Sequence, residues 1–268
     1  MNRKPIVAGL FYPGNAADLR KMIGKMVDLK AKKTRAIAVV SPHAGYLYSG
    51  NVAGAVFSAV EIPATVLVLG PSHRGIRPMA AIQRSDAWAT PLGDVPIAAD
   101  LADGILSRSR LVEDDPDAHL QEHSIEVQIP FLQYFRNDLS IVPLNISHRA
   151  GEKDLIGLGK AVAGAVAALG RDVLIVASTD MSHYVSREVA REKDGLAIDR
   201  ILAFDAAGLF RTVVAEDISM CGFQPVTATL IAAQELGAVK AEIVRYGTSG
   251  DTTGDNREVV GYAGIKIF

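Results

Sequence analysis

The runs AIAVVS at residues 36–41, TVLVLG at 65–70 and VLIVAS at 173–178 decide the fold of this 268-residue chain. Each run is apolar throughout and shows no alternation with polar residues. That pattern is typical of central strands whose two faces are both covered. Shorter runs at 140–144, 242–246 and 260–267 predict three further strands.

Helical patterns fill most of the sequence between these strands. In the first of them, Leu19, Ile23 and Met26 recur on one helical face. The predicted helices span residues 16–27, 51–60, 98–107, 154–169, 187–204 and 226–236. Strands that alternate with helices predict an α/β fold, here a single three-layer domain over residues 1–268 with a central mostly parallel or mixed sheet flanked by helices.

Composition excludes several classes of protein. The 28 Lys and Arg residues against 30 Asp and Glu give a formal net charge of −2, which argues against a nucleic-acid binder. The longest uncharged helical stretch, 161–170, is about half of what crossing a bilayer requires, and the apolar stretch 6–12 is too short for a signal peptide. The single cysteine, Cys221, excludes an intramolecular disulfide and favours a reducing compartment. We therefore expect a soluble cytoplasmic protein that binds neither nucleic acid nor membrane.

Three of the six histidines follow predicted buried strands within a few residues. His43 follows the first strand, His73 the second, and His183 follows the strand that ends at residue 178, with Asp180 between. If these strands are parallel, their carboxyl ends open on one edge of the sheet, where α/β proteins bind ligands. One loop histidine alone is more often solvated, but three at equivalent strand ends predict a metal site or an acid/base cluster.

The stretch AHLQEHSIEVQIPFLQYF at residues 118–135 adds further candidates. His119 and His123 are four residues apart and could chelate a metal from one helical face. Alternatively, His119 only helps the chain enter a helix that Glu122 caps. We favour His123 as a site residue and His119 as structural. His148 also follows a predicted strand, but its charged neighbours indicate a solvated loop, so it is left out.

Cys221 lies in the sequence MCGFQP, ahead of a predicted helix. A lone buried cysteine is usually an inert small apolar residue. A helix N-terminus, however, can lower the pKa of a thiol, so a functional role stays open. The chain has no GxxxxGK[ST] or GxGxxG motif after a strand and no CxxC motif, which leaves nucleotide-phosphate binding and zinc ribbons without support.

These motifs together resemble the Memo-like proteins, a family that includes the prokaryotic group called AmmeMemoRadiSam system protein B. The resemblance runs from residue 7 to the C-terminus, with the motifs in order. The matching segments are VAGLFYP (7–13), SPHAGYLYSG (41–50), GPSH (70–73), WATPLG (88–93), EHSIEVQIPFL (122–132), STDMSHY (178–184), CGFQP (221–225) and GDNREVVGYA (254–263).

The resemblance implies a fold like that of the class III extradiol ring-cleaving dioxygenases. Those enzymes hold Fe(II) with two histidines and a carboxylate and use another histidine as an acid and base. By motif, the metal ligands here would be His43, His73 and Cys221. A thiolate in place of the carboxylate suits iron or copper, with zinc a further option.

The resemblance also places Asp180, His183 and His123 in the same pocket, in catalytic roles. It favours a mononuclear metal-dependent oxidoreductase of unknown substrate, in which His183 moves protons and Asp180 orients an imidazole. Three alternatives use the same residues: a metal-sequestering protein, a module that binds a peptide or partner in an old dioxygenase-like cleft, and a zinc hydrolase. The group name further implies a functional link to a radical SAM protein and to an AMMECR-type domain (AmmeMemoRadiSam system protein A).

Overall fold

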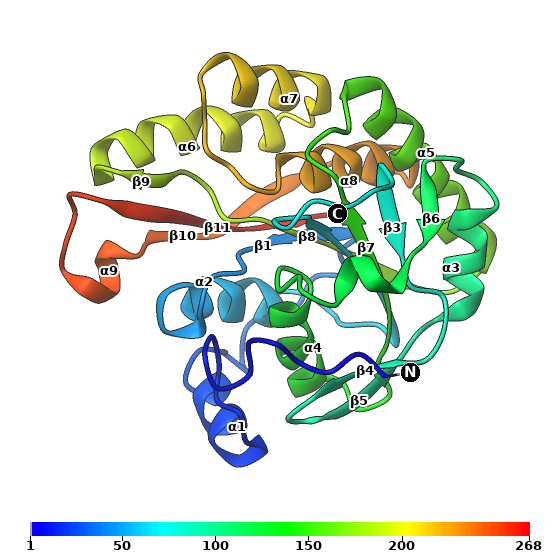
Figure 1. The fold of residues 1–268 in the computed structure, drawn as a ribbon. Coiled ribbons are helices and arrows are strands. Elements are labelled where there is room, and N and C mark those ends of the chain that lie inside the picture. The colour runs from blue at the N-terminus through cyan, green and yellow to red at the C-terminus, as the bar shows by residue number, and fades with distance from the viewer. Residues whose placement is uncertain (1) are drawn as a thin grey trace.

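A nine-stranded mixed sheet runs between two layers of helices in the computed structural model, which describes residues 2–268 (Figure 1). Its strands are β1 (Ala38–Ser41), β2 (Thr65–Pro71), β3 (Ala80–Ile82), β6 (Val112–Asp114), β7 (Ser140–Ile146), β8 (Val173–Ser178), β9 (His183–Val185), β10 (Ala241–Thr248) and β11 (Val259–Ile267). A separate hairpin is formed by β4 (Ala87–Thr90) and β5 (Gly93–Pro96).

The order of the strands is β10-β11-β1-β8-β2-β7-β3-β6, and β9 pairs with β11 outside this path. The four central strands β1, β8, β2 and β7 are parallel to one another. Strand β11 is antiparallel to β1, and β3 is antiparallel to β7. The predicted α/β fold with a mixed sheet between helices is therefore confirmed.

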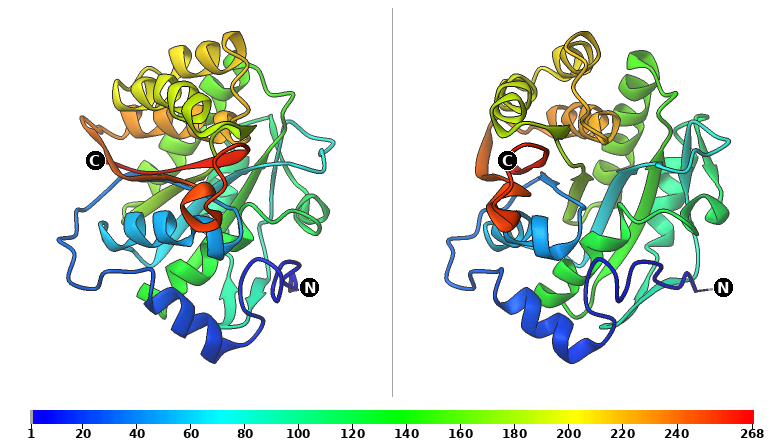
Figure 2. Two further views of the ribbon diagram at one scale, coloured as in Figure 1. Left: turned by 90° about the vertical axis from the view of Figure 1, so that its left-hand side faces the viewer. Right: turned by 60° about the vertical axis from the view of Figure 1, so that its left-hand side comes forward.

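Helices cover both faces of the sheet, as Figure 2 shows for α6 and α7 on one side and α1 and α2 on the other. One face packs against α3 (Ala99–Leu106), α5 (Glu152–Leu169), α6 (Arg187–Leu202), α7 (Ala206–Ala215) and α8 (Phe223–Glu235). The other face packs against α1 (Ala16–Gly24), α2 (Tyr46–Ser58) and α4 (Ile129–Phe135). Short helices η1 (Pro116–His119), η2 (Glu126–Gln128) and α9 (Gly250–Thr253) lie in connections. No helix within residues 2–268 is long and apolar enough to cross a membrane.

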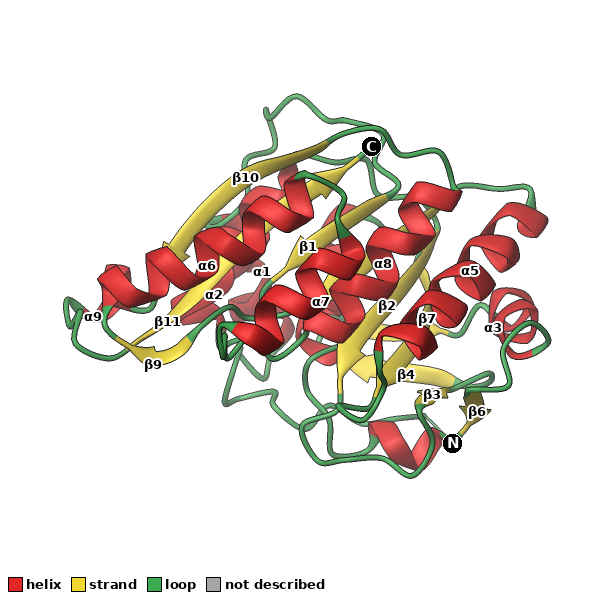
Figure 3. Ribbon diagram, turned by 90° about the horizontal axis from the view of Figure 1, so that it is seen from above, coloured by secondary structure: helices red, strands yellow, loops and turns green. Residues whose placement is uncertain are grey.

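The uniformly apolar central strands are buried on both faces, as their sequences predict. Strands β1, β2 and β8 have no exposed residue. Because successive side chains of a strand point to opposite faces, each strand contributes to both cores. Val40 and Ile175 pack in the core under the layer of α5 and α8 that Figure 3 shows from above, while Val39 and Val176 pack in the core of α2 and α4.

The helix boundaries differ from the predicted ones where local patterns are ambiguous. Helix α2 begins at Tyr46, five residues before the predicted start, because the Tyr46 side chain is buried between Tyr12 and Phe131 and not exposed in a loop. Helix α7 lies outside the predicted ranges. In the stretch 118–135 only the last turns form an α-helix, and Pro130 lies in its first turn, where a missing N–H costs nothing.

Two glycines of α5 provide a matched test of its packing against α8. A Cβ atom on Gly159 would lie 2.7 Å from the Ala228 carbonyl oxygen and from the Ile231 Cβ, whereas a Cβ on Gly157 would meet nothing within 4 Å. We expect Gly159→Ala to lower the free energy of unfolding by about 1–3 kcal/mol through overpacking. Gly157→Ala should raise it by roughly 0.5–1 kcal/mol, since only helix propensity changes there. Urea unfolding of both variants measures this, and the same sign for both would contradict the close α5–α8 contact.

Candidate metal centre

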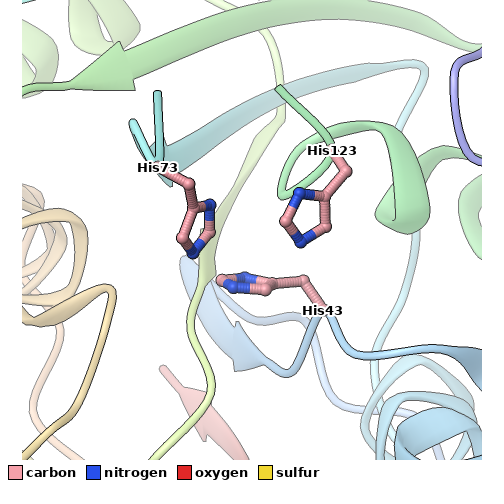
Figure 4. Close-up of side chains that lie close together, drawn as sticks. All are labelled: His43, His73 and His123. Atoms are coloured by element: carbon pink, nitrogen blue, oxygen red, sulfur yellow. The ribbon is translucent and has the colours of Figure 1, made fainter. Parts of the chain in front are cut away.

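Three histidines converge at the carboxyl edge of the parallel strands. His43 and His73 each lie two residues past the end of a strand, β1 and β2 respectively, and His123 comes from the turn that precedes η2. One ring nitrogen from each lies within 4.8 Å of the others, which is close enough for all three to bind one metal ion. Figure 4 shows the three rings turned toward a common point.

The three-histidine group is shielded from solvent on the side of His43 and exposed to solvent on the side of His73 and His123. The His43 ring is nearly perpendicular to those of His73 and His123, at centroid distances of 5.2 and 5.6 Å, while His73 and His123 are stacked at 4.8 Å. The side chain of His43 is 2% exposed, against 30% for His73 and 24% for His123. Solvent and small ligands therefore reach the group from the side of His73 and His123.

Hydrogen bonds fix the tautomer of His43. Its Nδ1 lies 2.9 Å from the Ser178 hydroxyl oxygen, and that hydroxyl donates its only proton to the Ser124 carbonyl at 2.6 Å. The Gln128 amide also donates to the Ser178 oxygen, at 2.8 Å. The Ser178 oxygen can thus only accept from His43, so Nδ1 carries the proton and Nε2 keeps its lone pair. Burial lowers the pKa of His43 well below its usual value, which keeps the ring neutral.

A buried carboxylate, Glu122, fixes His73 in the same way. It accepts the Nδ1–H of His73 at 2.9 Å and the backbone N–H of His73 at 2.7 Å. It also accepts the backbone N–H groups of His123 and Ser124 at 2.9 and 2.8 Å. Burial by itself raises the pKa of Glu122, but these hydrogen bonds outweigh it and hold the pKa far below the usual range. The Nε2 of His73 therefore carries a lone pair that is available to bind a metal ion.

Sequence reasoning missed this role of Glu122. The sequence offers Glu122 only as an alternative helix cap, and the residue does accept backbone N–H groups, but those of a turn and not of a helix. Its adjacency to His123 was the local signal that could have pointed to the site, because histidine ligands commonly donate to a carboxylate. The contact that matters, to His73, joins residues 49 positions apart.

Cys221 and Asp180 lie against the Nε2 side of His43. The Cys221 Sγ is 3.2 Å from His43 Nε2 and accepts the backbone N–H of Asp180 at 3.3 Å. Asp180 accepts the backbone N–H of His43 at 2.8 Å, and its other oxygen is 4.0 Å from His43 Nε2. Burial raises the pKa of Asp180 to about 6. Cys221 is thus adjacent to the histidine group, and a ligand role for it stays a prediction.

The helix N-terminus that follows Cys221 does not lower the pKa of its thiol. Helix α8 does begin two residues later, at Phe223. Burial, and after it the charge of Asp180, instead raise the pKa of the Cys221 thiol well above its usual value. Desolvation of a thiolate outweighs the partial charge of the helix end in this enclosed position.

The other histidines lie outside the three-histidine group. His183 begins β9, and its Nδ1 lies 2.9 Å from the Ser219 carbonyl, so Nδ1 carries a proton and Nε2 is free to accept one. His148 is exposed. His119 ends the short helix η1 and is buried, with its ring edge-to-face against Trp88 at a centroid distance of 5.6 Å. His119 and His123 therefore do not share a helical face.

His119 makes the folded protein sensitive to acid. Burial, and after it the positive charge of Arg3, lower its pKa to about 3, whereas an unfolded histidine binds a proton near pH 6.5. Below pH 6.5 the unfolded state therefore gains a proton that the folded state does not, and stability falls as the pH falls toward 3. His119→Phe keeps a ring against Trp88 but cannot bind a proton. Between pH 7 and pH 5, urea unfolding should show the wild type losing about 2 kcal/mol more than this variant. Equal losses in both would refute the assignment of a neutral buried ring.

The fold also occurs in a solved structure of low sequence similarity. The uncharacterized protein JW3007 from Escherichia coli K12 superposes with a TM-score of 0.52, over 85% of this chain and 99% of that chain, at 15% sequence identity. At this identity the similarity shows a shared fold and nothing about shared chemistry.

Relatives of higher sequence identity align with this chain over nearly its whole length. The chain is 40% identical to the MEMO1 family protein MTH_45 of Methanothermobacter thermautotrophicus, over 99% of this chain and 100% of that protein. It is 42% identical to a MEMO1 family protein of Pyrobaculum arsenaticum and 43% identical to one of Methanococcoides burtonii, with at least 98% of each chain covered. The family profile described as "Memo-like protein" matches residues 3–266. With nearly its whole length matched in this way, the chain belongs to the Memo-like protein family.

Proposed function

We propose that this protein is a mononuclear metal-dependent oxidoreductase whose ion, iron or copper, is held by His43, His73 and His123, with the Cys221 thiolate as a further ligand. The observation that carries the proposal is the group of three ring nitrogens within 4.8 Å of one another. In two of these rings the hydrogen bond at Nδ1 leaves the Nε2 lone pair available to a metal, and that of His43 lies 3.2 Å from the Cys221 Sγ.

The donor set fits a transition metal. Neutral imidazoles suit zinc, copper and iron, and a soft thiolate beside them favours the same metals over magnesium or calcium. The raised pKa of Cys221 does not oppose this, because a coordinated thiol is deprotonated by the metal itself. A bound iron or copper ion would supply one-electron redox chemistry at this position.

The residues around the group provide the remaining parts of such a site. His183, with its Nδ1–H donated to the Ser219 carbonyl, has a free Nε2 that can accept or return a proton of the substrate. Asp180 orients His43 by accepting its backbone N–H. The substrate would enter from the exposed side of His73 and His123.

A purely metal-sequestering role uses the same ligands, and the exposure of two of them argues against it. Structural zinc sites are closed by protein ligands, whereas catalytic zinc sites keep one position open to water or substrate. The partly exposed rings of His73 and His123 favour the second type.

Metal content tests the proposal first. Protein purified without oxygen should contain about one iron or copper ion per chain by elemental analysis, since a single group of ligands is present within residues 2–268. His43→Ala and His73→Ala should lose the metal, and Cys221→Ser should retain less of it. Glu113→Gln, which alters only an exposed ion pair with Arg77, is the control and should keep the wild-type content.

Oxygen consumption then separates catalysis from storage. The metal-loaded wild type should consume oxygen in the presence of a suitable oxidisable substrate from a broad screen, and His183→Gln should consume it more slowly while keeping its metal. Full metal loading with no turnover of any substrate would support sequestration instead. A wild type that binds no iron, copper or zinc would contradict both the catalytic and the metal-sequestering function.

Glu122→Gln should weaken metal binding without removing a ligand. A neutral amide holds the Nδ1–H of His73 less strongly than a carboxylate does, so the metal dissociation constant should rise about 10- to 100-fold. Competition with a chelator of known affinity measures this. Glu113→Gln, which alters an exposed ion pair with Arg77, serves as the control and should leave the affinity unchanged.

A further inference from the structure

Arg3 is a buried cation, 3% exposed, that lies behind the segment carrying Glu122 and His123. Its Nε donates to the His119 carbonyl at 2.7 Å, and its Nη2 donates to the Glu122 carbonyl at 2.6 Å. Its Nη1 donates to the Glu126 carboxylate at 2.8 Å. One guanidinium group thus contacts three positions along residues 119–126.

The same cation is fixed from its other side. Its guanidinium carbon lies 4.1 Å from the centre of the Trp88 ring, which is itself buried. The Glu126 carboxylate also accepts the backbone N–H groups of Ile6 and Val7 and the Tyr12 hydroxyl, the last at 2.7 Å. The N-terminal segment and residues 119–126 are therefore joined through one buried ion pair.

Residues 120–125 have no regular secondary structure to hold them in place. They lie between η1 and η2 and belong to no strand, so no ladder of backbone hydrogen bonds sets their path. Side-chain hydrogen bonds hold this path instead: Ser124 bonds Ser178 and Pro71 at one end. Arg3 donates to the carbonyls of His119 and Glu122 at the other end, and bonds from a charged donor are stronger than neutral ones. Between these fixed points the chain turns Glu122 toward His73 and places the His123 ring beside it.

We propose that Arg3 is a positioning residue of the metal centre: its guanidinium fork sets the path of residues 119–126, and through Glu122 and His123 it orients two of the three histidines. The N-terminal segment is then part of the site, and its Phe11 also lies edge-to-face against the His123 ring, at a centroid distance of 5.0 Å. The proposal rests on the metal-binding function proposed above.

The competing explanation is that Arg3 only neutralises the buried Glu126. Arg3→Ala cannot separate the two, because it would leave Glu126 buried without a partner and could unfold the protein. Arg3→Lys can, because it keeps the positive charge for Glu126. A lysine ammonium lacks the planar fork and cannot bond both carbonyls and the carboxylate in the same geometry.

The experiment compares the wild type with Arg3→Lys and with Ile105→Val, a control in the core on the opposite face of the sheet. The first measurement is the dissociation constant of cobalt(II), by competition with a chelator. The second is hydrogen exchange of the His123 and Ser124 amides in the metal-free protein, since both donate to Glu122. We expect Arg3→Lys to raise the dissociation constant about 10-fold or more and to speed exchange at these amides, with Ile105→Val unchanged in both.

Several results would overturn the proposal. Wild-type affinity and wild-type exchange in Arg3→Lys would mean that Arg3 is only the charge partner of Glu126. Equal losses in Ile105→Val, at a matched unfolding midpoint, would mean that global stability controls the site. If Arg3→Lys does not fold, the double variant Arg3→Met with Glu126→Gln removes both charges and is put through the same measurements. If the wild type binds none of cobalt, iron, copper or zinc, the proposed function fails, and the exchange of the two amides alone decides whether Arg3 orders the segment.

Discussion

Four parallel strands, β1, β8, β2 and β7, end side by side, and this constraint underlies everything in the candidate metal centre. Parallel pairing with a one-to-one register brings the segments after β1, β2 and β8 to a single edge of the sheet. His43, His73 and Asp180 each lie two residues past a strand end and therefore meet in space. A change of direction in any of these strands would carry its group to the opposite edge, about 20 Å away.

Hydrogen bonds fix the orientation of two imidazoles in the site that results. Burial keeps His43 neutral, and its Nδ1–H donates a hydrogen bond to the Ser178 hydroxyl oxygen. The Nδ1–H of His73 donates to the Glu122 carboxylate, and the hydrogen bonds that Glu122 accepts hold its pKa low. These hydrogen bonds set the orientation of both rings, so each presents its Nε2 toward the other histidines of the group.

Family membership and chemistry are separate matters in this protein. Identities near 40% over whole chains establish the Memo-like family, and the solved structure at 15% identity establishes only the shared fold. The chemistry has to be argued from the site, where imidazoles, a thiol and two buried carboxylates meet. The family resemblance names His43, His73 and Cys221, while the geometry adds His123 to the first two as a third nitrogen donor.

The sequence by itself determined the six longer strands of the sheet but not β3, β6 and β9, and it determined most helices. It also determined the strand-end positions of His43 and His73, because these depend on local periodicity and on short motifs. Only the tertiary structure decided which residues far away in the sequence form hydrogen bonds and ion pairs around these histidines. Glu122 meets His73 across 49 residues, and Arg3 meets Glu126 across 123, and no local pattern encodes such pairs. The direction of the Cys221 pKa shift was likewise decided by burial, which depends on how the surrounding elements pack and not on the residues beside it.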